Sequence, residues 1–122
     1  ILTSEYKKGP FKAILHCFSS GKKLAETGIK LGFFISFSGI VTFNSAKNIQ
    51  NIAKIVPLNK ILIETDSPYL APTPLRGKIN EPKNCIYTAK FLAELKGLSF
   101  DDFANYTYNN SINIFNKITR CN

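Results

Sequence analysis

Residues 61–68 read Ile-Leu-Ile-Glu-Thr-Asp-Ser-Pro. Three aliphatic residues run directly into two carboxylates and a proline, which is typical of a buried strand that ends at a turn. Asp66 then lies at the carboxyl end of a strand, where α/β proteins place metal and substrate sites. The alternative interpretation is structural, with Asp66 capping the turn at Ser67 and Pro68 through bonds to nearby backbone N–H groups.

Composition and length limit the class of protein. The 122 residues, of which 44% are hydrophobic and 20% charged, fit one small globular domain. Apolar runs are interrupted well before the roughly 18 residues that a membrane span needs, so we expect a cytoplasmic protein with no membrane partner. Three cysteines without CxxC spacing predict neither a disulfide framework nor a zinc ribbon. The chain lacks methionine and opens with Ile1, which indicates part of a longer protein, a trimmed product or an unusual start.

The net charge of +8 leaves two interpretations open. A basic protein attracts polyanions, which favours a nucleic-acid face. Most of the basic residues, however, are lysines scattered along the chain, and scattered lysines are typical of a solvated surface. Aromatic residues do not alternate with a basic patch in the sequence, so a simple nucleic-acid-binding module is the least expected class.

Hydrophobic periodicity predicts strands that alternate with helices. Residues 1–10 read as the tail of a preceding element and a turn. The expected strands are residues 11–16, 33–37 and 61–63, and the expected helices run from a cap at residues 19–21 to Gly32, from an N-cap at Ser45 to Pro57, from about Pro82 to Lys96, and onward from a capping box at Ser99. This order predicts a parallel sheet with helices packed on it, and three parallel strands alone leave two open edges. We therefore expect residues 1–122 to form a single partial domain, about three consecutive units of a larger α/β barrel.

His16 is the only histidine and also falls at the end of a predicted strand. The ends of parallel strands lie at one edge of a sheet, so His16 and Asp66 are expected to project from the same rim. An imidazole and a carboxylate there suit a divalent metal. The alternative is a core histidine whose ring bonds to a backbone carbonyl.

Several further motifs occupy the strand ends and loops of this order. They are residues 16–19 (HCFS), 32–43 (GFFISFSGIVTF), 64–70 (ETDSPYL), 74–78 (PLRGK) and 80–82 (NEP), with Thr107, Asn110 and Phe115 near the end of the chain. In order and spacing they resemble the C-terminal part of the TatD family of metal-dependent hydrolases, and the resemblance covers residues from about 11 to 115. Ser20 departs from the glycine that is usual in the family, although Gly21 is adjacent.

The resemblance implies a TIM-type (β/α)8 barrel whose sixth to eighth strands are the three predicted here. It implies a DNase that hydrolyses phosphodiesters with one or two divalent cations, Mg, Zn or similar, and therefore DNA as the substrate and partner. On this resemblance His16 and Asp66 are metal ligands, and Asp66 also acts catalytically by holding or deprotonating the attacking water. The family's paired histidines, its glutamate and its other histidine have no counterpart in this sequence, so we expect the chain alone to be inactive.

Two further positions carry expectations. Glu64 should face the same side as Asp66, one layer deeper, because side chains alternate along a strand. A buried carboxylate needs a partner, which we expect to be a basic residue outside this chain; the alternative is a frayed, solvated strand end. Arg76 is expected to bind substrate phosphate, assisted by Lys78, or else to tie its loop to the barrel. Asn80, Glu81 and Pro82 are expected to do structural work at the start of the next helix, with Pro82 near the first helical position.

Two alternative functions come from other classes. The chain could be a truncated or split-gene remnant without independent catalysis, which open sheet edges favour. It could instead be a complementing subunit that pairs with a separately encoded N-terminal half.

Overall fold

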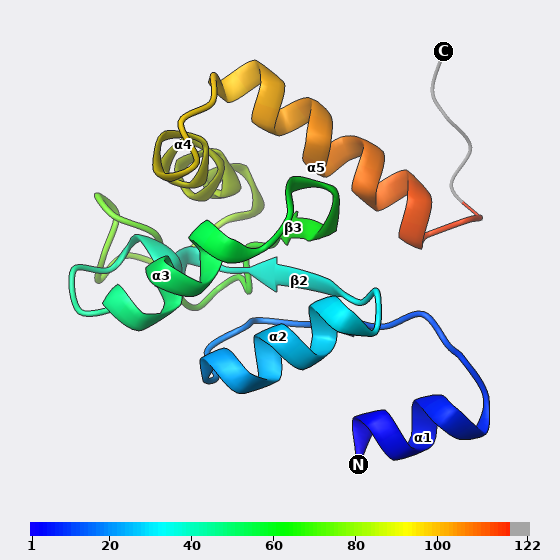
Figure 1. Cartoon of the computed structure of the whole chain (residues 1–122). Coiled ribbons are helices and arrows are strands. Elements are labelled where there is room, and N and C mark those ends of the chain that lie inside the picture. Colours follow the sequence, from blue (N-terminus) through cyan, green and yellow to red (C-terminus); the bar gives the residue numbers. More distant parts are fainter. Residues whose placement is uncertain (118–122) are drawn as a thin grey trace.

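The computed structural model describes residues 1–117 and contains a parallel three-stranded sheet flanked by α-helices (Figure 1). The elements, in chain order, are α1 Leu2–Lys8, β1 Ile14–Leu15, α2 Lys22–Lys30, β2 Phe34–Phe37, α3 Lys47–Ile55, β3 Ile61–Ile63, α4 Cys85–Leu95 and α5 Phe100–Ile114, with short 3₁₀ turns at Gly39–Thr42, Leu58–Lys60 and Pro82–Asn84. The predicted order of strands and helices is confirmed. Cys121 lies outside the described residues.

The sheet has the order β1-β2-β3, and both pairs are parallel. Ile35 of β2 is level with Leu15 of β1 on one side and with Ile61 of β3 on the other. This register brings all three carboxyl ends to one edge of the sheet. The edge therefore collects the residues that follow each strand.

The helices pack along the strands and cover them with apolar side chains. In Figure 1, α2 lies along β2, and α5 lies along β3 with α4 beyond it. Ile35 and Phe37, alternate residues of β2, belong to one buried cluster together with Ile61, Leu92 of α4 and Phe103 of α5. Burial of such side chains stabilises the fold by about 1.5–3 kcal/mol each. No helix among residues 1–117 is long and apolar enough to cross a membrane.

The amino-terminal region differs from the prediction. Residues 2–8 form α1 instead of a tail, and the first strand has two residues instead of six. The strand is short because β2 offers no extended partner before Phe34: Gly32, at φ +78°, turns the chain there. The residues ahead of β1 are held by side chains, since the Phe11 ring packs 5.6 Å from that of Tyr6 and 5.3 Å from that of Phe33, between centroids.

Two of the four predicted helix starts are confirmed, with Gly21 at the N-cap of α2 and Ser99 at the N-cap of α5, and the other two are displaced by one to three residues. Ser45 does not cap α3; Ala46 occupies that place because its N–H closes a turn on the Phe43 carbonyl while its own carbonyl accepts the first helical bond. Pro82 begins a 3₁₀ turn, and α4 follows at Cys85. Ser99 does cap α5: its Oγ accepts from the Asp102 N–H at 3.1 Å, which is one half of the predicted capping box, and its hydroxyl donates to the Asp102 carboxylate at 2.7 Å.

Candidate metal site

The end of β3 is joined directly to the end of β1 by Glu64. Its Oε1 lies 3.1 Å from His16 Nε2, and its Oε2 accepts a hydrogen bond of 3.2 Å from the Cys17 backbone N–H. The Glu64 side chain is 14% exposed, whereas that of His16 is 70% exposed. Glu64 is thus largely buried, as expected. His16 and Cys17, which contact it, belong to this chain, and the expected basic partner outside the chain stays a prediction.

All three strand ends converge around Cys17. Its Sγ lies 3.4 Å from Ser38 Oγ, which follows β2, and 3.8 Å from Asp66 Oδ2, which follows β3. Cys17 and Asp66 both have positive φ, at 44° and 57°, which non-glycine residues rarely adopt. These backbone turns place His16, Glu64 and Asp66 at the same edge, as the sequence predicts.

Cys17 itself is a poor candidate for nucleophile or metal ligand. Burial raises the pKa of its thiol above the ordinary value, and the negative charges of Asp66 and Glu64 raise it further, while the Ser38 hydroxyl opposes the change. Since the thiolate is the reactive and metal-binding form, the neutral thiol acts here as a packing and hydrogen-bonding group.

The side chains at this edge fit part of a cation site. Glu64 Oε1 is buried and has no hydrogen-bond partner among the described residues, although it lies 3.1 Å from the His16 ring nitrogen. A buried carboxylate oxygen without a hydrogen bond is costly, and a cation would satisfy it. Imidazole nitrogen is a suitable donor for Zn²⁺, and carboxylate oxygen is suitable for Zn²⁺ or Mg²⁺. Within residues 1–117, however, no three His, Cys, Asp or Glu side chains form a complete ligand cluster.

Asn80 fixes the turn that carries Asp66, a role that the sequence did not reveal. Its Nδ2 donates to the carbonyls of Thr65 at 2.7 Å and Tyr69 at 2.8 Å, and its backbone N–H donates to the Pro68 carbonyl at 2.9 Å. The Tyr69 N–H closes the same turn on the Asp66 carbonyl at 3.0 Å. Asn80 is 3% exposed, so the Asp66 turn is held by a buried amide from a later loop.

Arg76 lies on the same side of the molecule as this turn but does not join His16 or Asp66. Its guanidinium carbon sits 3.6 Å from the centroid of the Phe43 ring. The contact supports the interpretation in which Arg76 ties its loop to the body of the protein. A guanidinium that lies over an aromatic ring can still donate hydrogen bonds through its N–H groups. The phosphate contact of Arg76 therefore stays a prediction.

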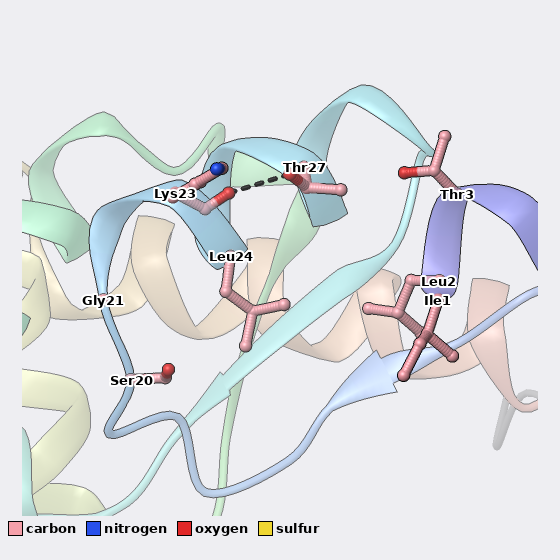
Figure 2. Close-up of a pocket in the computed structure, with 8 residues that line it drawn as sticks. All are labelled: Ile1, Leu2, Thr3, Ser20, Gly21, Lys23, Leu24 and Thr27. Atoms are coloured by element: carbon pink, nitrogen blue, oxygen red, sulfur yellow. Dashed lines mark hydrogen bonds between the residues drawn. The ribbon is translucent and has the colours of Figure 1, made fainter.

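A separate hollow of about 550 Å³ lies between α1 and the start of α2 (Figure 2). Leu2 and Leu24 face each other across it, and its other lining residues are Ile1, Thr3, Ser20, Gly21, Lys23 and Thr27. No carboxylate or imidazole lines it. The hollow is therefore not part of the candidate metal site.

The parallel strands alternate with helices and end in an imidazole and two carboxylates at one edge. This arrangement is part of an α/β barrel of the kind that binds its ligands at the carboxyl ends of the strands. A family model described as "TatD related DNase" matches residues 1–116. The chain belongs to this family.

Individual relatives agree with this assignment. The chain is 46% identical over 102 residues to the uncharacterized metal-dependent hydrolase YcfH of Escherichia coli K12. The matched region is 84% of this chain and 38% of YcfH. Its fold matches the solved structure of YJJV, a TatD homologue of E. coli K12, with a TM-score of 0.79, 28% identity and coverage of 87% of this chain and 41% of that one. A TatD family hydrolase of Entamoeba histolytica gives a TM-score of 0.78 at 25% identity, over 93% of this chain and 45% of that one.

The chain thus spans about 40% of the length of the relatives it matches. The predicted fold class, the C-terminal part of a barrel hydrolase, is confirmed by these matches.

Proposed function

We propose that this chain supplies the last part of a metal-dependent phosphodiesterase that hydrolyses DNA. The observation that carries the proposal is the contact between Glu64 and His16 at the carboxyl edge of the sheet, where Asp66 follows the same strand as Glu64. One oxygen of Glu64 is buried there without a hydrogen bond. Membership of the TatD-related DNase family supports the choice of DNA as substrate.

Each side chain has a distinct task in this proposal. A divalent cation would supply Lewis-acid polarisation of the phosphate and an acidified water, and His16 and Asp66 would hold it. Asp66 would also orient the attacking water and accept its proton, since a carboxylate can act as a general base. The turn that carries Asp66 is fixed by Asn80. Arg76 would grip a phosphate oxygen of the substrate through its free N–H edge.

The isolated chain is expected to bind divalent cations weakly and to lack nuclease activity. A catalytic metal ordinarily has at least three protein ligands, and residues 1–117 do not bring three together. The remaining ligands would come from the part of the barrel that the relatives have in addition, whether it belongs to the same polypeptide or to a separately encoded half.

A chimera tests the proposal directly. The amino-terminal part of YcfH would be fused ahead of Ile1, and cleavage of a fluorogenic DNA substrate would be measured with Mg²⁺, Mn²⁺ or Zn²⁺, alongside the chain alone. We expect metal-dependent cleavage by the chimera only, reduced about 100-fold or more by Asp66→Asn. Asp101→Asn, an exposed carboxylate of α5, is the matched control and should leave the rate unchanged.

Two outcomes would contradict this proposal. A folded chimera that binds metal but does not cleave DNA would exclude the DNase assignment. Cleavage by the purified chain alone, lost in Asp66→Asn, would show that the amino-terminal ligands are dispensable.

A further inference from the structure

A groove of about 460 Å³ lies beside the Asp66 turn, and we call it the Tyr69 groove. The lining residues that matter here are Phe43, Tyr69, Arg76 and Lys78. They come from two loops, one after the 3₁₀ turn that follows β2 and the other after β3. None of the residues that line the groove is acidic.

Tyr69 presents an exposed ring on a fixed backbone. The residue is 72% exposed, yet its N–H donates to the Asp66 carbonyl at 3.0 Å and its carbonyl accepts from Asn80 Nδ2 at 2.8 Å. A large aromatic ring held in solvent by a rigid turn loses little conformational freedom when a flat ligand stacks on it. The Tyr69 ring is therefore suited to stacking.

Positive charge also lines the groove. The Arg76 guanidinium is fixed over the Phe43 ring, 3.6 Å from its centroid, and Lys78 is exposed at the groove. The Phe43 contact limits the freedom of the guanidinium, and a planar guanidinium can grip phosphate oxygens through its N–H groups. An aromatic face beside two cations is the combination that binds single-stranded nucleic acid, whose bases stack and whose phosphates need neutralisation.

We propose that the Tyr69 groove binds single-stranded DNA next to the metal site, with one base stacked on Tyr69 and the adjoining phosphate held by Arg76 and Lys78. The inference rests on the proposed function for its choice of DNA. Asp66 and Tyr69 belong to one closed turn, so the stacked nucleotide would neighbour the nucleotide whose phosphate lies at Asp66. The groove would then select substrates with an unpaired base near the cleaved bond.

The experiment uses the absence of tryptophan from the whole sequence. Tyr69→Trp introduces a single tryptophan, excited selectively at the red edge of its absorption, to be titrated with an oligothymidylate and with an abasic oligonucleotide of the same length. The buffer contains no divalent cation, so no cleavage is required. We expect saturable quenching by the oligothymidylate and little by the abasic strand, because only bases stack on an indole ring.

Affinity is measured in parallel by the anisotropy of a labelled oligothymidylate. Tyr69→Ala should weaken binding about 5- to 100-fold, which corresponds to the loss of one stacked base. Tyr108→Ala removes another exposed tyrosine, 49% exposed on α5, and should not change the affinity. Equal affinity of the unsubstituted chain and Tyr69→Ala, or equal binding of abasic and base-bearing strands, would overturn the inference.

This outcome is separable from that of the chimera experiment. Stacking without DNA cleavage would refute the proposed hydrolysis and keep the Tyr69 groove as a binding site. Cleavage by the chimera with no effect of Tyr69→Ala on binding would keep the hydrolysis and refute the groove.

Discussion

Asn80 allows a quantitative test of how the Asp66 turn is held. Its side chain donates two hydrogen bonds to carbonyls on either side of Asp66 and accepts two more, from the Glu81 N–H at 3.0 Å and from Asn84 Nδ2 at 3.2 Å. Asn80→Ala removes all four. Water can replace the partner of Glu81, which is exposed, but Asn84 is only 5% exposed and would be left unsatisfied.

The expected loss follows from these contacts. Each intramolecular hydrogen bond contributes about 1 kcal/mol net, and an unsatisfied buried group costs about 1–3 kcal/mol. Water can replace the bonds at Tyr69 and Glu81, which are both exposed residues, so the loss is the bond to Thr65 and the unsatisfied amide of Asn84. Asn80→Ala should therefore lower the free energy of unfolding by about 2–4 kcal/mol, a large part of the 5–15 kcal/mol typical of a domain. Asn80→Asp keeps the shape but turns carboxylate oxygens toward two carbonyls, so it should destabilise at least as much.

Urea unfolding followed by circular dichroism measures the effect, with the midpoint expected to fall and the slope to stay constant. Asn51→Ala is the matched control, because Asn51 is exposed on α3, where alanine is the better helix former. A midpoint for Asn80→Ala equal to that of the unsubstituted chain would refute the reasoning. It would mean that the turn keeps its shape without the buried amide.

Two further substitutions test the packing around the site. Lys96 Nζ donates to three carbonyls at the end of α3, at 2.8–3.0 Å. Lys96→Met should therefore lower the free energy of unfolding by about 2–3 kcal/mol in the same urea assay. Lys90, which is exposed on α4, is the control, and Lys90→Met should be neutral. A Cβ at Gly39 would collide with the Leu70 backbone carbonyl, so Gly39→Ala should lower the free energy of unfolding by about 2–3 kcal/mol, measured by thermal unfolding. Gly9 has open space around it, so Gly9→Ala should change little. Equal effects of the two substitutions would contradict the close packing of the Gly39 loop.

The strand and helix order was predictable because it depends on local patterns. Apolar runs and turn residues mark β2, β3 and most helix limits. Ser99 caps α5 by accepting a hydrogen bond from Asp102, three residues later in the chain. The errors at the amino-terminal end arose where contacts with another segment set the limits of an element. β1 is short because β2 offers it no longer partner, and α1 rests on aromatic contacts between Tyr6 and two other rings.

The site was predictable only in outline. Parallel strands bring their carboxyl ends to one edge, so the shared edge of His16 and Asp66 could be foreseen from the sequence. The partners of Glu64 could not, because the Cys17 N–H lies 47 residues away and is aimed by a positive φ that no sequence pattern reports. The buried role of Asn80 was missed for the same reason: its hydrogen-bond partners lie 11 and 15 residues earlier in the chain.

By itself the sequence determined the class of fold, the family, and which residues stand at the strand ends, because these depend on local periodicity and on motifs in a fixed order. Only the tertiary structure decided which atoms meet. The sequence shows no basic patch with interleaved aromatics, yet folding places Arg76 on Phe43 beside Tyr69. Loops from neighbouring parallel strands converge at one edge, so residues far apart in sequence become neighbours, and their contacts depend on register and backbone angles that are fixed only when the whole sheet packs.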